Sequence, residues 1–351
     1  MNEDDIFRWQ DEARRNLSAA SGKSVRANLS RKLPATAIRS ADLLRSATPL
    51  FSKAGYATAI LWSQVLQGRD AGQLFEETLD RLYTNPVLIE DKALWVLVQV
   101  LLRAQQQFTS KSCSAPTKEE TLSGELLSAI MSHADIWAEK GERLLNQANA
   151  RLQIARIDLQ LGHREGETGG DFGLIVEYER NGKIFYLPLI FQAKRYDGTT
   201  ADISRSHKTR GFQYATLRGQ KCAAAYLFYN NGKVKITDNI PPLAKSVQDT
   251  APPSVNTHTN VGEKTYDFFS FVMKAIAGGS DFPTAEDEER ALSMIISTAP
   301  LDELIAIVAL GRLDGTQARY ESAFTNVTTG YAPDNDTDPD DPWTGNKNRP
   351  T

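Results

Sequence analysis

Asp171 and the triplet Gln192-Ala193-Lys194 are the residues of this chain whose types and spacing suggest metal-dependent chemistry. The stretches 172–179 and 184–192 connect the two motifs and are rich in β-branched and aromatic residues, which is typical of strands. Asn181-Gly182 separates these stretches, and Asn-Gly is the strongest short signal for a two-residue hairpin turn. We therefore expect both motifs at the open end of one β-hairpin.

The Asn-Gly turn also predicts the pairing register of this hairpin. With Arg180 opposite Lys183, counting outward along both strands places Asp171 opposite Gln192. Residues that face each other across a ladder point to the same side of the sheet, and so do residues two apart on one strand. Asp171, Gln192 and Lys194 are therefore expected together on one face.

The opposite face of the hairpin is apolar in this register and is expected to be core. Its residues are Phe172, Leu174, Val176, Tyr178, Phe185, Leu187, Leu189 and Phe191. Pro188 lies inside the second stretch, and proline in a sheet favours an edge or a bulge. A one-residue bulge there would shift the register and separate the polar residues.

The polar residues at the end of the hairpin fit the hydrolysis of a phosphodiester bond. A divalent cation polarises the phosphate and lowers the pKa of an attacking water, and Mg²⁺ prefers oxygen ligands. The Asp171 carboxylate and the Ala193 carbonyl are candidate ligands of Mg²⁺ or Mn²⁺, and Lys194 is a candidate for stabilising the transition state. The simpler alternatives, a turn aspartate and a solvated strand-end lysine, stay open.

The two motifs resemble those of the PD-(D/E)xK nuclease superfamily, in its Mrr-like restriction-endonuclease branch. The matching stretches are Gly169-Gly170-Asp171-Phe172-Gly173 and Ile190-Phe191-Gln192-Ala193-Lys194-Arg195. Members of that branch often carry glutamine where others carry the second acid. The wider stretch Glu165–Asp171 looks like an E-x-x-T-G-x-D form associated with nucleases of bacterial anti-phage defence. This makes Glu165 a candidate for an additional acid.

The resemblance also implies a helix before the hairpin that supplies a further carboxylate. A helix is expected from about residue 118 to 133, continuing after a break to about 154, and its apolar stripe includes Leu122 and Leu126. At 100° per residue Glu119 projects close to this stripe, so it is the first candidate and Glu120 the second. A helix at 211–220 and a strand at 223–229 match the element order that the superfamily has after its lysine.

The segment between Lys194 and Lys221 is basic, with seven lysines and arginines against two aspartates. Such a patch suits phosphate binding, although an ordinary solvated loop and helix face is an equal alternative. The candidate nucleic-acid-binding residues here are Arg195, Lys208, Arg210 and Gln213.

Composition narrows the function classes further. The net charge of −4 excludes a globally basic nucleic-acid coat, so any nucleic-acid site must be a local patch. Two distant cysteines and four scattered histidines give no zinc spacing, and the chain has no phosphate-loop motif for ATP hydrolysis. No secretory signal or membrane-length apolar run is present, so a cytoplasmic protein without membrane contact is expected.

Hydrophobic periodicity divides the chain into four regions. The expected order is a helical N-terminal region (1–112), a nuclease core (113–245), a helical C-terminal region (246–330) and a disordered acidic tail (331–351). Residues 93–102 are expected as a buried helix, and residues 301–310 as part of a helix. The expected fold is therefore α/β: a restriction-endonuclease-like core, with a mixed sheet, a β-hairpin and flanking helices, carrying helical additions at both ends.

The function expected from these features is that of a metal-dependent endonuclease, an effector in anti-phage defence or restriction. The expected partner is nucleic acid, DNA rather than RNA, and the expected cofactor is Mg²⁺ or Mn²⁺. A homo-oligomer and a partner protein of a defence system are both open. One alternative is a catalytically inactive nuclease fold that binds nucleic acid or serves as a scaffold subunit. Another is a helical scaffold in which residues 1–110 bind a sensor.

Overall fold

The structure is a computed structural model that describes residues 91–296, the strand 305–311 and residues 319–320 and 322–323. Short gaps lie at 114–115, 149, 161–163, 181, 197, 208–210, 232–240 and 262. The predictions for residues 1–90 and for the tail 331–351 lie outside the described residues. So do the predicted phosphate contacts of Lys208 and Arg210.

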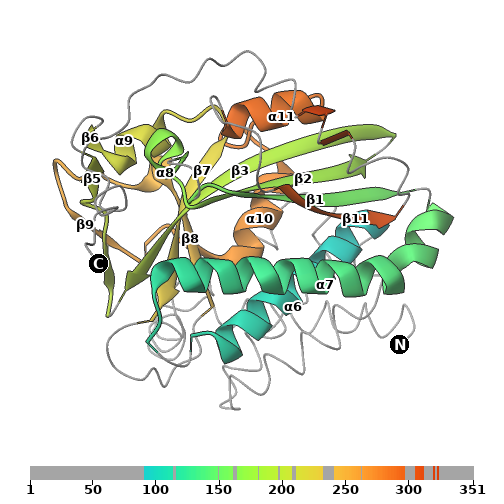
Figure 1. The fold of residues 1–351 in the computed structure, drawn as a ribbon, viewed down its shortest axis with the longest axis horizontal. Helices are drawn as coiled ribbons and strands as arrows, with labels where there is room; N and C mark the ends of the chain where they lie inside the picture. Colours follow the sequence, from blue (N-terminus) through green and yellow to red (C-terminus); the bar gives the residue numbers. More distant parts are fainter. Residues whose placement is uncertain are drawn as a thin grey trace, which may run out of the picture.

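A seven-stranded mixed sheet forms the centre of the described part of the chain (Figure 1), in the order β10-β8-β7-β3-β2-β1-β11. Its strands are β1 (Arg151–Asp158), β2 (Phe172–Arg180), β3 (Lys183–Tyr196), β7 (Ala223–Asn230), β8 (Leu243–Ser246), β10 (Tyr266–Asp267) and β11 (Ile305–Gly311). Neighbouring strands run antiparallel except β3 and β7, which are parallel. The smaller ladders pair β4 (Thr200–Asp202) with β9 (His258–Asn260) and β5 (Ser206–His207) with β6 (Gly211–Phe212). The predicted α/β class with a mixed sheet is confirmed.

Helices cover both faces of the sheet (Figure 1). One face carries α6 (Lys92–Lys111), α7 (Glu119–Ala148) and α10 (Phe268–Ala277), and the other carries α9 (Gln213–Arg218) and α11 (Glu288–Ile295). The short helices α8 (Arg164–Thr168) and η2 (Val247–Asp249) lie beside α9. Within the described ranges, none of the helices combines the length and apolar character that crossing a lipid bilayer requires.

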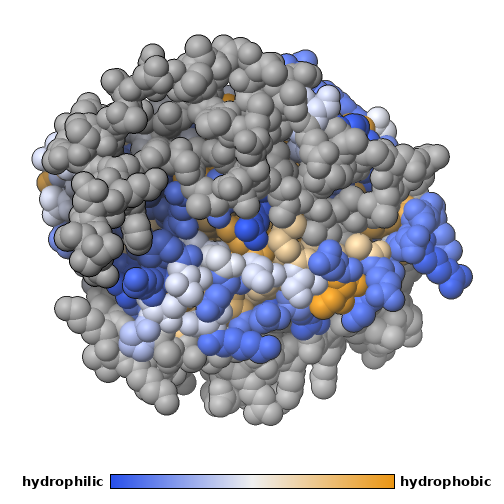
Figure 2. Space-filling view, viewed as in Figure 1, coloured by the Kyte–Doolittle hydropathy of each residue, from blue (hydrophilic) through white to orange (hydrophobic). Residues whose placement is uncertain are grey.

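α6 is the buried helix predicted around residues 93–102. Asp91 caps its N-terminus by accepting the N–H of Leu94 at 3.0 Å, and residues 93–102 are all buried. α6 and α10 pack into the same hydrophobic core as β2 and β3, so this core extends across the boundaries predicted at 112 and 246. α7 lies across the outside of this layer, and Figure 2 shows mostly hydrophilic side chains along its outer surface.

The predicted register of the β2–β3 hairpin is confirmed. Phe172 faces Phe191 and Arg180 faces Lys183, and the ladder runs without a bulge through Ile175 opposite Pro188. The Phe191 carbonyl accepts the N–H of residue 171, so odd-numbered residues here turn their backbone groups toward β2. Pro188 therefore faces the β7 side, where pairing begins only at the next residue. Its missing N–H removes no ladder hydrogen bond, which is why the strand tolerates it.

The apolar face of the hairpin is core, as predicted. The Phe191 ring stacks on Phe172 at a centroid distance of 5.2 Å and meets the rings of Phe268 and Phe271 of α10 edge-on. The opposite face is also buried along most of its length, because Ile190 and its neighbours pack beneath α9 and α11 in a second core. The polar residues therefore occupy only the end of that face.

For residues 134–154 the predicted helix is confirmed as far as Ala148, but the predicted break and the helix over 151–154 were wrong. α7 is one continuous helix to Ala148, without the expected break, and residues 151–158 form the strand β1. β1 lies between β2 and β11 and is mostly buried, but its run of 8 residues mixes polar and apolar side chains and follows closely on a helical segment. Periodicity alone does not separate such a run from a buried helical segment.

The helix predicted at 301–310 was also wrong over its second half. Residues 305–311 form β11, an antiparallel strand at the edge of the sheet beside β1. The run Ile305–Leu310 is short and apolar, and only its pairing with a strand far earlier in the chain determines its conformation.

Replacing Phe191 by alanine tests the packing of the hairpin. Phe191→Ala removes a fully buried ring with three aromatic neighbours, so the free energy of unfolding should fall by about 3–5 kcal/mol. Urea unfolding of the full chain measures this loss. Val255, 78% exposed, supplies the control, and Val255→Ala should change stability by less than about 0.5 kcal/mol. Equal effects of the two substitutions would contradict the described core.

Candidate active site

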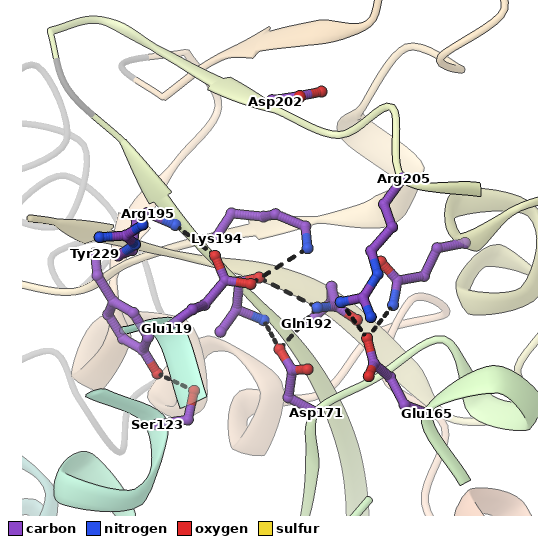
Figure 3. A network of polar contacts seen from close by, with 12 residues as sticks. Glu119, Ser123, Glu165, Asp171, Gln192, Lys194, Arg195, Asp202, Arg205 and Tyr229 are labelled. Atoms are coloured by element: carbon purple, nitrogen blue, oxygen red, sulfur yellow. Dashed lines mark hydrogen bonds and ion pairs between the residues drawn. The ribbon is translucent and has the colours of Figure 1, made fainter. Parts of the chain in front are cut away.

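Asp171 is held at the open end of the hairpin by hydrogen bonds to β3. The side chain is only 4% exposed, and its Oδ2 accepts the Ala193 N–H at 2.6 Å and Gln192 Nε2 at 2.7 Å. Its backbone N–H donates to the Phe191 carbonyl at 2.8 Å. The predicted position of Asp171 opposite Gln192 is therefore confirmed (Figure 3).

Two glycines just before Asp171 let the backbone there pass close to α9 and β3. Gly169 has φ of 74°, and a Cβ there would lie 2.8 Å from the backbone nitrogen of Leu217 and 2.9 Å from the carbonyl oxygen of Gln213 in α9. A Cβ on Gly170 would overlap the side chain of Ile190 in β3. The Gly-Gly pair before Asp171 is thus required by a left-handed conformation at the first glycine and close packing at both.

Glu119, the first residue of α7, connects this helix to the lysine of the triplet. Its Oε1 lies 3.4 Å from Lys194 Nζ, and its Oε2 accepts the Arg195 N–H at 2.8 Å. Figure 3 shows Glu119 and Lys194 pointing toward each other next to Asp171. Glu120, the second candidate from the sequence, is exposed on α7. The contacts with Lys194 and Arg195 therefore hold Glu119, and not Glu120, at the site.

Contacts missed at the sequence level position the start of α7. The Thr117 N–H donates to Asn231 Oδ1 at 2.8 Å, and the Thr117 carbonyl accepts Arg195 Nη1 at 3.0 Å. One turn into the helix, the hydroxyls of Ser123 and Tyr229 are 3.2 Å apart. Tyr229 and Asn231 lie at the end of β7 and are buried, so they hold α7 against the sheet. The polar residues at the end of the apolar strand β7 were the sequence signal that could have predicted these contacts.

A second group of polar side chains lies on the other side of Asp171. Glu165 Oε1 accepts Gln213 Nε2 at 2.7 Å and pairs with Arg205 Nη1 at 2.8 Å. Glu165 and Gln213 were both sequence candidates, one as an acid and one as a phosphate contact, and the structure joins them directly. Arg205 was counted in the basic segment but was not singled out from the sequence.

Burial raises the pKa of Asp171 from its ordinary value of 3.8 to about 7. The positive charge of Lys194 opposes this rise, and the negative charges of Glu165 and Glu119 add to it. The Ala193 N–H favours the ionised form. Asp171 therefore changes protonation near neutral pH, a property that clusters at functional sites.

The oxygen atoms at this site fit a hard cation that keeps several waters. Among the described residues, no cluster of three or more histidine, cysteine, aspartate or glutamate side chains is placed to hold a metal ion. The carboxylates of Asp171 and Glu119 nevertheless both lie beside Lys194 (Figure 3), and the nearby Ala193 carbonyl accepts Gln192 Nε2 at 3.2 Å. Gln192 Oε1 is buried and has no hydrogen-bond partner, so an acceptor beside Asp171 is unsatisfied. Carboxylate, carbonyl and amide oxygens are the ligands that Mg²⁺ takes.

Comparison with known proteins identifies no relative, because the chain matches no protein-family model and no curated protein. Of the sequence candidates, the structure brings together Asp171, Gln192, Ala193, Lys194 and Glu119, and beside them Glu165 and Gln213. The guanidinium of Arg195 turns to a backbone carbonyl of its own chain. The function is therefore inferred from these residues themselves.

The raised pKa of Asp171 predicts a pH dependence of stability. The folded state binds this proton more tightly than the unfolded chain, so the stabilisation is complete below about pH 4 and is lost as pH rises through about 7. The unfolding free energy of the wild type, relative to that of Asp171→Asn, should therefore decrease across this window. Urea unfolding at several pH values measures the difference, with Asp281→Asn, at an exposed position, as control. A difference that stays constant with pH would contradict the raised pKa.

Proposed function

We propose that this protein is a metal-dependent nuclease that hydrolyses phosphodiester bonds, with DNA as the expected substrate. The observation that carries the proposal is the convergence of Asp171, Lys194 and Glu119 at one end of β3. Glu119 comes from a helix 75 residues before Lys194, whereas Asp171 and Lys194 come from one hairpin, and the carboxylate of Asp171 at the centre is buried. The order of hairpin, helix and parallel strand supports a restriction-endonuclease-like core.

Each side chain has a defined part in this proposal. Asp171 and Glu119, with the Ala193 carbonyl, would hold Mg²⁺ or Mn²⁺, which supplies Lewis-acid polarisation of the phosphate and a water of lowered pKa. The described residues donate only to Oδ2 of Asp171, which leaves Oδ1 for a cation. Gln192 keeps the carboxylate in this orientation. Lys194 Nζ, which points toward Glu119 beside Asp171, would contact the phosphate or orient the attacking water.

The resemblance of the stretch Glu165–Asp171 supports a role in anti-phage defence or restriction. That form is the feature that connects the chain to defence nucleases, and it contains both Glu165 and Asp171 of the site. A second copy of the chain or a defence partner protein is a further proposed partner.

A catalytically inactive nuclease fold is the second candidate, and Gln192 is the observation that favours it. Glutamine supplies a neutral ligand where an acid would supply a charge, so the cation is held by fewer negative groups. Such a protein would bind nucleic acid or act as a scaffold subunit. Cleavage measurements separate the two candidates directly.

Substitution of Lys194 tests the reaction class. We expect the wild type to cleave duplex DNA with Mg²⁺ or Mn²⁺ and not with EDTA, and Lys194→Ala to lower the cleavage rate by about 100-fold or more. Lys183→Ala, at an exposed lysine at the other end of β3, should leave the rate unchanged. Single-stranded DNA and RNA are tested in parallel. Intact substrate under every condition, or equal rates for wild type and Lys194→Ala, would refute the proposal.

Cation binding tests the two carboxylates separately from cleavage. Asp171 must lose its proton to bind a cation, so Mn²⁺ should bind about tenfold more tightly at pH 8 than at pH 6, as titration calorimetry measures. Glu119→Gln should weaken binding, whereas the neighbouring Glu120→Gln, on the exposed side of α7, should not. Equal effects of the two glutamine variants would exclude Glu119 as a ligand.

A further inference from the structure

A second carboxylate–cation pair, Glu165 with Arg205, lies beside Asp171, across the site from the pair of Glu119 with Lys194 (Figure 3). We propose that Arg205 binds a phosphate group of the nucleic-acid substrate, and that Glu165 holds the guanidinium in place until the substrate takes it. This inference rests on the proposed function, because it concerns the substrate of the same site.

The backbone around Arg205 is anchored, so its side chain starts from a defined position. The Arg205 carbonyl accepts the Gln213 N–H at 3.0 Å, which ties the residue to the start of α9. Gln213 Nε2 and Arg205 Nη1 then meet at the same oxygen, Oε1 of Glu165, at 2.7 and 2.8 Å. Three segments, α8, α9 and the connection from β4 to β5, therefore converge on one carboxylate.

The exposure of the Arg205 side chain makes it available to a ligand. It is 59% exposed, and an exposed ion pair contributes little to the stability of the fold, because water and salt screen the two charges. A phosphate offers the guanidinium two parallel charge-assisted hydrogen bonds and releases counterions when it binds. Glu165 keeps its hydrogen bond from Gln213 after Arg205 leaves. When Arg205 moves from Glu165 to a phosphate, Oε1 of Glu165 therefore still has a hydrogen-bond donor.

The chain also contains an ion pair of the opposite kind. Glu177 of β2 pairs with Arg151 and Arg319, and its side chain is fully buried. Removing one partner of a buried pair leaves an uncompensated charge inside the protein, so such a pair is structural. The Glu165–Arg205 pair differs in both exposure and place, since it lies at the rim of the candidate active site.

The position of Arg205 relative to Asp171 and Lys194 suits a substrate that spans the site. Figure 3 shows Arg205 paired with Glu165 on one side of Asp171, and Lys194 paired with Glu119 on the other. Both cationic groups therefore border the same space, one on each side of the buried carboxylate. A polyanionic chain crossing this space meets Lys194 on one side and Arg205 on the other.

A purely structural ion pair would give a different pattern of effects from the one proposed. If the pair only fastens the loop to α8, removing either charge weakens the fold and has the same effect on binding. If Arg205 serves the substrate, removing its charge weakens binding, whereas neutralising Glu165 frees the guanidinium and strengthens binding. The two substitutions therefore act in opposite directions only under the proposal.

Oligonucleotide binding by the full chain measures these directions. Fluorescein-labelled single-stranded and duplex DNA are titrated in EDTA, which prevents metal-dependent cleavage, and anisotropy is recorded over a range of salt concentrations. We expect Arg205→Gln to weaken binding about tenfold and to reduce the salt slope by about one. Glu165→Gln should tighten binding several-fold. Arg143→Gln, at an exposed arginine of α7 near the end away from the site, should leave affinity and slope unchanged.

The outcomes separate this inference from the proposed nuclease activity. Equal weakening by Arg205→Gln and Glu165→Gln, with equal losses of melting temperature, would show a structural pair and overturn the inference. Wild-type affinity in Arg205→Gln, or no binding of DNA by the wild type, would also overturn it. Opposite effects of the two variants in a protein that cleaves nothing would support the phosphate contact and refute the nuclease.

Discussion

The hydrogen bond from the Ala193 N–H to the Asp171 carboxylate is the interaction on which the rest of the site depends. Odd-numbered residues of β3 turn their backbone groups toward β2, but the ladder ends at Phe172. Ala193 therefore has no strand partner on that side, and the side chain of Asp171 replaces the missing carbonyl. Because Oδ2 also accepts Gln192 Nε2, the carboxylate is held at the sheet end, where Lys194 and Glu119 reach it. The carboxylate that ends the ladder is thereby fixed beside Lys194 and Glu119.

Burying that carboxylate has an electrostatic cost, and the surrounding charges modify it. Desolvation favours the protonated acid, while Lys194 and the Ala193 N–H favour the carboxylate. The result is a pKa of about 7, so neither the protonated acid nor the carboxylate dominates at neutral pH. Gly169 contributes indirectly, because it packs closely against α9 and its N–H donates to the Glu165 carbonyl at 2.8 Å, and the negative charge of Glu165 adds to the raised pKa of Asp171. Backbone packing and the protonation state of the site are therefore coupled.

The sequence predicted the local part of this arrangement and, of its long-range contacts, only the approach of Glu119 that the family resemblance suggested. An Asn-Gly turn and an alternating apolar face were sufficient to place Asp171 opposite Gln192, because a hairpin register depends on adjacent segments only. β1 and β11 were not recognised, since β1 mixes polar and apolar residues over a short run and β11 becomes a strand only by pairing with β1, far earlier in the chain. The pair of Glu165 with Arg205 was missed for the same reason. Its partners lie in separate segments, and no local pattern records their contact.

In the proposed nuclease, the resting site balances its own charges. Glu119 is paired with Lys194 and Glu165 with Arg205, so the two cationic groups proposed to hold phosphate are each paired with a carboxylate. If Glu119 also held a divalent cation, its attraction for Lys194 would weaken, and Lys194 would become available to the substrate. A substrate phosphate bound to Lys194 would in turn leave Glu119 available to the cation. By thermodynamic linkage the two ligands then strengthen each other's binding. The two ion pairs would therefore oppose the binding of the cation alone, or of the phosphate alone, more than the binding of both together.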